Sequence, residues 1–273
     1  MINFVYKPNY NVADLEHIVA ILRAPGGCPW DAEQDHRSIR RNLLEEAYEA
    51  CEAIDEESAV HLQEELGDVL LQVVFHAQME KEQGSFTLDD VADGVCKKLI
   101  FRHPHVFGNV EVADSAEVLT NWEELKKQEK HQDSATATLE AVAKSLPALW
   151  RAEKVQKKAA KVGFDWPDAS GALDKLSEEV DELKEAVTGG DKAAIAEELG
   201  DLLFAAVNVS RFVKVDSEDA LTAATEKFIR RFALVEEKAK GQGRDMKDMT
   251  LAELDALWDS AKEDLKGGPQ GRF

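Results

Sequence analysis

Two acidic helical patterns on either side of Gly189-Gly190-Asp191 constrain this sequence more than any other feature. Each pattern carries two carboxylates three positions apart, Glu179 with Glu182 and Glu198 with Asp201. Residues at this spacing lie on adjoining turns of one helix face. A short break between two helices favours an antiparallel pair. The sequence therefore predicts a helical hairpin whose four carboxylates face one another.

Carboxylates that converge in this way repel each other and call for a positive counter-charge. At about 4 Å and an effective dielectric of about 20, one pair of like charges costs about 4 kcal/mol. A ligand set made only of oxygens favours a hard divalent cation, Mg²⁺ or Mn²⁺. The alternative is an ordinary solvated acidic face that flanks the apolar stripe of each helix.

The same pattern occurs a second time, 133 positions earlier in the chain. Apolar residues keep the same register, since Leu43 corresponds to Leu176 and Val74 to Val207. This internal duplication predicts a second acidic hairpin and favours metal sites over solvated faces. The carboxylates of the first copy are Glu46, Glu49, Glu65 and Asp68.

Each copy also contains a basic pair four positions apart in its third helix. The first copy has Lys98 and Arg102, and the second has Lys227 and Arg231. Such a pair suits the oxygens of a polyphosphate, and arginine offers bidentate geometry. A solvated basic face would give the same spacing.

Three further residues are candidates on weaker grounds. Trp122 and Trp258 occupy matching places in the two copies, and we expect them to anchor a core or an interface. Asn208 is polar within an apolar helix, where its amide either binds a ligand or pairs with the backbone.

The composition limits the partners of the chain. A formal net charge of −21 argues against a nucleic-acid polymer or an anionic membrane, because few positive groups are available to neutralise phosphates. Three cysteines without a CxxC motif indicate neither a disulfide framework nor a zinc site. With no signal peptide or long apolar run in the sequence, we expect a cytoplasmic protein.

The expected fold is all-α, with two tandem helical modules that arose by duplication. We expect an N-terminal module over residues 1–133, a linker over 134–138 and a C-terminal module over 139–273. Within the first module, helices are expected over residues 11–24, 38–56 and 59–83. Thr87 and Asp90 predict a capping box that opens the next helix.

These motifs resemble those of the MazG-type nucleoside triphosphate pyrophosphohydrolases over nearly the whole chain, including the tandem layout. The matching segments are GGCPWD at 26–31, LEEAYE at 44–49, RHPHVF at 102–107, VGFDW at 162–166, ELGDLLFA at 198–205 and KFIRRF at 227–232. The resemblance implies an all-α dimer that uses Mg²⁺ to hydrolyse nucleoside triphosphates to monophosphates and pyrophosphate. It also implies that the C-terminal module is the main catalyst.

The resemblance also implies roles for individual residues. The metal ligands would be Glu179, Glu182, Glu198 and Asp201. Glu178 and Glu197 would lie near the nucleotide, where either could orient or deprotonate the attacking water. Lys227, Arg231 and Trp258 would bind the triphosphate and nucleotide, and the two cations would stabilise the leaving pyrophosphate.

Two alternative functions are compatible with the same residues. One is a non-catalytic regulatory module that binds a metal–nucleotide complex. The other is a related pyrophosphohydrolase with narrower nucleotide specificity, because no sequence feature defines recognition of the base.

Overall fold

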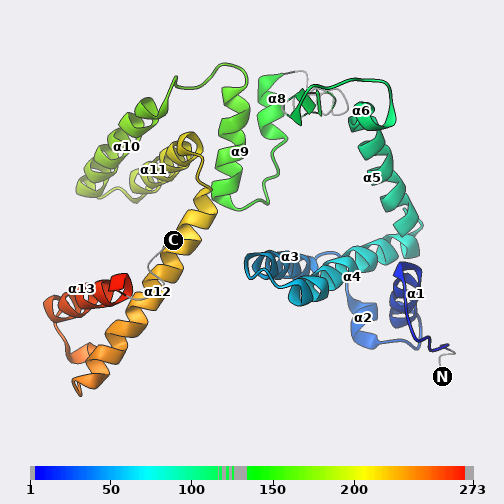
Figure 1. Cartoon of the computed structure of the whole chain (residues 1–273), viewed down its shortest axis with the longest axis horizontal. Helices are drawn as coiled ribbons and strands as arrows, with labels where there is room; N and C mark the ends of the chain where they lie inside the picture. The colour runs from blue at the N-terminus through cyan, green and yellow to red at the C-terminus, as the bar shows by residue number, and fades with distance from the viewer. Residues whose placement is uncertain (1–3, 116, 119–120, 123–124, 126–133, 268–273) are drawn as a thin grey trace. The chain divides into compact units, whose positions relative to one another are not determined.

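The computed structural model describes residues 4–115, 117–118, 121–122, 125 and 134–267, and all regular elements in these ranges are helices (Figure 1). The expected all-α class is therefore confirmed. The chain divides into two compact units, Met1–Lys130 and His131–Phe273, and each contains one acidic hairpin. Every helix in the described ranges is too short or too polar to cross a membrane.

In the first unit, α3 (Arg40–Asp55) and α4 (Ala59–Gln83) form the predicted hairpin. The Ser58 hydroxyl accepts a hydrogen bond from the His61 amide at the start of α4. The hairpin is preceded by α1 (Val12–Arg23) and α2 (Pro29–Glu33), and it is followed by α5 (Leu88–Arg102) and α6 (Pro104–Phe107). The predicted capping box of Thr87 and Asp90 opens α5.

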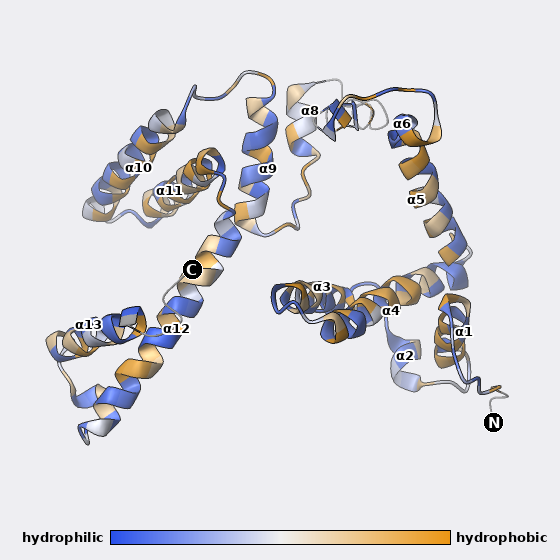
Figure 2. Cartoon of the chain, viewed as in Figure 1, coloured by the Kyte–Doolittle hydropathy of each residue, from blue (hydrophilic) through white to orange (hydrophobic). Residues whose placement is uncertain are grey.

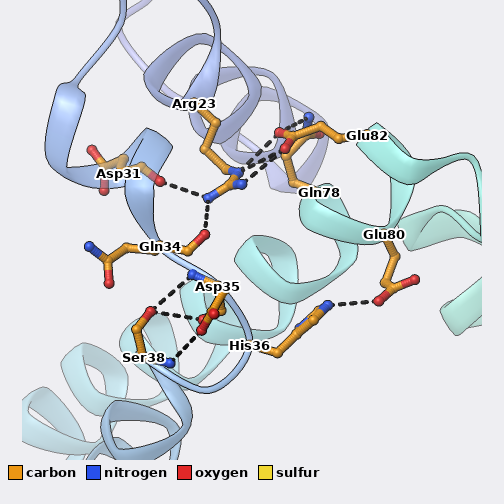
Figure 3. A network of polar contacts seen from close by, with 9 residues as sticks. All are labelled: Arg23, Asp31, Gln34, Asp35, His36, Ser38, Gln78, Glu80 and Glu82. Atoms are coloured by element: carbon orange, nitrogen blue, oxygen red, sulfur yellow. Dashed lines mark hydrogen bonds and ion pairs between the residues drawn. The ribbon is translucent and has the colours of Figure 1, made fainter.

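Helix α3 begins two residues later than the sequence indicates, because Ser38 belongs to a turn. Its hydroxyl accepts a hydrogen bond from the Asp35 amide and donates one to the Asp35 carbonyl (Figure 3). The Asp35 carboxylate in turn accepts from the amides of Arg37 and Ser38. Ile39 is left at the N-cap of α3 without a side-chain hydrogen bond.

Arg23, at the end of α1, also holds the segment before α3 in place. Its guanidinium donates to the carbonyls of Asp31 and Gln34 and pairs with the Glu82 carboxylate at 3.0 Å (Figure 3). The end of α1, the α2 segment and α4 are thus joined by one side chain. The core between α1 and α4 is formed by Val19, Ile39, Val74, Phe75 and Met79.

In the second unit, α10 (Ala169–Gly189) and α11 (Lys192–Val213) form the second hairpin. Asp168 and Asp191 cap the two helix starts. Gly190 ends α10 with a φ of 73°, a left-handed conformation that favours glycine. In both hairpins, hydrophobic and hydrophilic residues alternate around the helices (Figure 2), as expected for helices with one apolar face.

Along the chain, within the described residues of the second unit, two helices precede the hairpin, and two α-helices with a short 3-10 helix between them follow it. The preceding helices are α8 (Ala135–Glu140) and α9 (Ala148–Ala160), and the following ones are α12 (Ser217–Gly241), η1 (Met246–Asp248) and α13 (Leu251–Gly267). A buried cluster of Val235, Ala239, Leu257 and Ala261 packs α13 on the C-terminal part of α12 (Figure 1).

The segment expected as a linker, residues 134–138, is partly helical. Ser134 accepts a hydrogen bond from the Ala137 amide, and α8 starts at Ala135. A serine N-cap followed by alanine and leucine residues is sufficient to start a short helix. The boundary of the predicted N-terminal module at residue 133 lies outside the described residues.

Candidate functional site

The second hairpin brings three of the predicted metal ligands together. One carboxylate oxygen from each of Glu179, Glu182 and Glu198 lies within 4.8 Å of the others. Glu179 is only 4% exposed, and its Oε2 has no hydrogen-bond partner among the described residues. Because an unpaired buried carboxylate oxygen is unfavourable, this oxygen is suited to bind a cation.

Asp201, the fourth predicted ligand, is not part of that group of three. It lines a cavity together with Glu179, so the two carboxylates border the same space. The arrangement is therefore three close carboxylates on α10 and α11 with a fourth beside the adjoining cavity.

The first unit repeats this arrangement. Carboxylate oxygens of Glu46, Glu49 and Glu65 lie within 4.8 Å of one another. Glu65 is buried, and its Oε2 has no hydrogen-bond partner in the part of the chain that the structure describes. Asp68 is outside the group, but its negative charge contributes to the raised pKa of Glu46.

Lys175 supplies positive charge at the second cluster, and it is not among the predicted site residues. Its ammonium lies 2.6 Å from Glu179 Oε1 and 2.9 Å from Glu178 Oε1. Hydrogen bonds to Glu179 and then to Glu178 raise the pKa of Lys175 above its ordinary value. The i,i+4 spacing from Lys175 to Glu179 is the sequence signal that could have identified this contact.

In the first unit, a histidine contacts the acidic cluster. His61 Nε2 lies 3.2 Å from Glu65 Oε1, and His61 Nδ1 lies 2.8 Å from Glu56 Oε2. Its hydrogen bond to Glu56 raises the pKa of His61 most, and Glu65 adds to the effect. The position that corresponds to Lys175 is Asn42. The two clusters therefore share their carboxylates but not the side chains that pair with them.

In each cluster one carboxyl has a raised pKa, first through burial and then through the neighbouring negative charges. Burial raises the pKa of Glu182, and the charges of Glu179 and Glu198 raise it further against the opposing effect of Lys175. Burial also raises the pKa of Glu46, with Asp68 and Glu49 as the next causes. Both carboxyls thus hold their protons more tightly than usual, as expected where negative charges converge.

The oxygen-only donor sets fit a hard divalent cation. Each cluster offers carboxylates from both helices of a hairpin, and each includes one buried oxygen without a hydrogen-bond partner among the described residues. Carboxylate oxygens are preferred by Mg²⁺ and Mn²⁺ over softer metals. Both units could therefore hold such an ion.

The predicted basic pairs lie on α5 and α12, and their arginines share an unpredicted feature. The guanidinium carbon of Arg231 lies 5.8 Å from the ring centre of Trp258, and that of Arg102 lies 5.2 Å from Trp122. Each unit thus repeats an arginine–tryptophan contact. Lys98 and Lys227 are exposed.

The structure does not bring the second basic pair to the carboxylate cluster. Among the described residues, no ion pair joins Lys227 or Arg231 to Glu179, and the positive charge with the largest effect on Glu182 is Lys175. The other two predicted residues, Glu178 and Glu197, are exposed and adjoin Glu179, which is buried, and Glu198, which is half-buried.

Asn208 lies in the wall of the cavity that Glu179 and Asp201 border. It is buried, and its Oδ1 accepts hydrogen bonds from Arg211 Nε at 3.0 Å and Nη2 at 2.7 Å. The cavity has a volume of about 490 Å³, is open to solvent, and is lined by residues of α8, α9, α10 and α11 and of the segment before α10. This volume is typical of a small-molecule site, for which about 300–1,000 Å³ is usual.

Comparison with known proteins identifies the family. A model of the MazG nucleotide pyrophosphohydrolase domain matches residues 34–107 and 169–235. The chain is 45% identical to the nucleoside triphosphate pyrophosphohydrolase/pyrophosphatase MazG of Thermotoga maritima, over 91% of this chain and 94% of that protein. It is 44% identical to the nucleoside triphosphate pyrophosphohydrolase of Escherichia coli K12, over 90% and 94%.

The chain is also 51% identical to the uncharacterized protein YabN of Bacillus subtilis, over 90% of this chain, and it spans half the length of that relative. The two matched regions contain the two acidic hairpins described above. The chain belongs to the MazG nucleotide pyrophosphohydrolase family.

Proposed function

We propose that this protein hydrolyses nucleoside triphosphates to nucleoside monophosphates and pyrophosphate in the presence of Mg²⁺, with Mn²⁺ as an alternative ion. The observation that carries the proposal is the second cluster, where the unpaired buried oxygen of Glu179 lies next to Glu182 and Glu198. Two relatives of nearly equal length carry the name of this activity, which supports the same assignment.

The proposed metal ligands are Glu179, Glu182 and Glu198, with Asp201 at the edge of the cavity. The corresponding carboxylates of the first unit would bind a second ion; they are Glu46, Glu49, Glu65 and Asp68. A bound divalent ion supplies charge neutralisation at the phosphates and an activated water. The protein residues position the reactants around it. Exposed Glu178 or Glu197 would accept a proton from the attacking water, since each adjoins a proposed ligand in sequence.

Lys227 and Arg231 would stabilise the leaving pyrophosphate, with Trp258 supporting the arginine. Since no ion pair among the described residues connects them to the cluster within one chain, we infer that a second copy supplies them in a homodimer. Exposed apolar side chains on the second hairpin support an interface. They include Val187, Leu199 and Leu203.

The decisive experiment measures pyrophosphate release from the common nucleoside triphosphates with Mg²⁺. Glu179→Gln and Glu198→Gln should each reduce turnover on the order of 100-fold, because each removes a charged ligand at nearly constant volume. Glu185→Gln, an exposed position on the same helix, is the matched control. Near-normal turnover in both ligand variants would contradict the metal assignment.

The same assay distinguishes the regulatory alternative, since a sensor binds the nucleotide without releasing pyrophosphate. Among active proteins, the ratio of kcat/KM values across the triphosphates separates broad from narrow specificity. We expect this activity to operate on free nucleotides in the cytoplasm, and we expect no affinity for nucleic-acid polymers or membranes.

A further inference from the structure

The mechanism proposed above gives no role to the cavity beside the second cluster. We propose that this cavity receives the nucleobase of the nucleoside triphosphate, and that buried core side chains fill the corresponding positions of the first unit. This inference rests on the proposed function and names the part of the substrate that the second unit recognises. It follows from the polar groups of the cavity wall, from the aromatic residues at its edge and from the duplicated register.

Gln156 on α9 provides the most specific feature of the wall. It is 7% exposed, and its Nε2 donates a hydrogen bond to the Phe204 carbonyl at 2.8 Å. This bond fixes the orientation of the amide, because the flipped amide would oppose two oxygens. Its Oε1 is buried without a hydrogen-bond partner among the described residues. A ligand N–H is the group that would satisfy this oxygen, and a phosphate, which presents acceptors, would not.

Asn208 on α11 offers the complementary group. Arg211 occupies its Oδ1 with two hydrogen bonds, so the amide nitrogen is left as the donor. Arg211 also donates to the Asp165 carboxylate at 2.9 Å, and this pairing lowers the pKa of Asp165. One arginine thus orients Asn208 and ties the segment before α10 to α11. The same cavity is therefore lined by one acceptor, on α9, and one donor, on α11, and these are the two kinds of group that a nucleobase edge requires.

Phe164 and Trp166 border the same cavity from that segment. A Cβ on Gly171 would collide with the Trp166 ring, so the ring packs closely against the first turns of α10. Both aromatic side chains remain partly or largely exposed. Exposed aromatic faces beside a cavity are suited to stack on a planar heterocycle.

The first unit has larger apolar side chains at the corresponding positions. In the 133-residue register, Ala172 corresponds to Ile39 and Asn208 to Phe75. Ile39 is 4% exposed and Phe75 is 7% exposed, and both belong to the same buried cluster. Arg23 packs 5.2 Å from the centre of the Phe75 ring. The first unit therefore keeps the carboxylates but fills these two positions of the wall with core residues.

The test transfers the first-unit residues into the second unit of the full-length chain. The variants are Ala172→Ile and Asn208→Phe, with Ser177→Ile on the exposed side of α10 as the matched control. The substrates are nucleoside triphosphates and ribose 5-triphosphate, which carries the same phosphates without a base. Filling the cavity should raise the KM for nucleoside triphosphates about tenfold or more, and it should leave the hydrolysis of ribose 5-triphosphate unchanged.

Gln156→Met tests the hydrogen bond to the base separately, because it removes the amide at similar volume. It also removes the hydrogen bond from Nε2 to the Phe204 carbonyl, and the rate with ribose 5-triphosphate measures any effect of that second loss. Loss of one hydrogen bond should raise the KM for nucleoside triphosphates roughly two- to tenfold without an effect on ribose 5-triphosphate. This variant still tests the base site if a thermal melt shows that Asn208→Phe is unfolded. An unchanged KM in the folded variants, or equal kcat/KM of the wild type for ribose 5-triphosphate and nucleotides, overturns the proposal.

A direct binding measurement separates this inference from the proposed activity. Should the wild type release no pyrophosphate from any triphosphate, the proposed function fails, and calorimetry with nucleoside monophosphates then tests the cavity alone. Binding to the wild type that is lost in Ala172→Ile and in Gln156→Met supports the base site. Absence of binding to the wild type, or equal binding to all variants, overturns it.

Discussion

The Lys175 ammonium lies 2.6 Å from the Glu179 carboxylate, one turn away on α10. The Glu179 side chain is 5% exposed, so its charge is poorly screened by solvent. Lys175 therefore offsets part of the repulsion among the carboxylates of the acidic cluster. A divalent cation at the cluster would compete with Lys175 for the same carboxylate.

Lys175→Gln should destabilise the protein without Mg²⁺ and have little effect with it. Removal of the ammonium leaves Glu179 beside Glu182 and Glu198, and we expect a loss of about 1 kcal/mol, since Lys175 itself is over one-third exposed. Thermal melts with and without Mg²⁺ measure the difference. Lys184→Gln removes the exposed ion pair with Asp181 on the same helix. It should leave the melting temperature unchanged both with and without Mg²⁺. Equal losses under both conditions would contradict the competition.

Mg²⁺ alone should raise the melting temperature through both clusters. Occupancy at about 100 times Kd stabilises a site by about 2.7 kcal/mol. We expect an ion in each unit, because each cluster has one buried oxygen, of Glu65 or Glu179, without a partner among the described residues. Glu65→Gln and Glu179→Gln should each remove part of the shift, and the double variant should remove it. A full shift in the double variant would exclude these clusters as the binding sites.

Gly171→Ala should disturb the second unit, although alanine generally favours a helix. The substitution normally stabilises a helix interior by about 1 kcal/mol, but here the added Cβ collides with the Trp166 ring. We expect a lower melting temperature and a red-shifted tryptophan emission. Gly94→Ala on α5 meets nothing within 4 Å, so it should keep the emission unchanged and show the normal gain. Stabilisation by Gly171→Ala would mean that the ring is not packed there.

A histidine pair should make the stability of the first unit sensitive to pH. His36 Nδ1 lies 2.7 Å from His76 Nδ1. His36 Nε2 lies 2.7 Å from Glu80 Oε1, and Figure 3 shows this second contact. Burial, followed by the charge of His36, lowers the pKa of His76 from its ordinary value of 6.5. Below pH 6.5 the unfolded chain therefore binds a proton that folded His76 resists, and stability falls as the pH decreases toward the lowered pKa.

His76→Asn should remove the loss of stability toward low pH, because it removes the group whose pKa is lowered in the folded state. The raised pKa of His61 acts in the opposite direction and remains in this variant. The measurement is the free energy of unfolding of the first unit between pH 7.5 and about 5. His17→Asn, at an exposed position on α1, serves as the control and should keep the slope of the wild type. An equal slope in the His76 variant would exclude this pair as its source.

Helices and side-chain contacts that depend only on the spacing of residues within a hairpin are predictable from the sequence. The sequence places the second helix of the first hairpin at residues 59–83, and α4 has these bounds. Spacing also predicts the convergence of Glu179, Glu182 and Glu198, because i,i+3 positions and a short turn determine which helix faces meet. The role of these acids as metal ligands stays a prediction. The start of α3 was not predictable from spacing, since the Asp35–Ser38 turn uses the capping hydroxyl.

The cavity was not predictable because its wall is assembled from contacts between separate helices. Gln156 on α9 meets the Phe204 carbonyl of α11, and helical periodicity within either segment does not report this contact. The packing of Trp166 against Gly171 likewise depends on the path of the segment before α10. Once the structure identifies the wall, the duplication becomes informative, because Ile39 and Phe75 show what the chain places at the same positions elsewhere.

Complementation between two inactive variants tests whether a second copy completes the site. Glu179→Gln removes a proposed metal ligand on α10, and Arg231→Gln removes a proposed phosphate ligand on α12, where Arg231 lies 5.8 Å from the Trp258 ring centre. If the two groups come from different copies, a mixed dimer contains one site with both defects and one intact site. Co-expression should then restore up to about a quarter of the wild-type turnover, since about half of the dimers are mixed. Recovery that does not exceed the activity of either variant alone would place Glu179 and Arg231 of one chain in the same site.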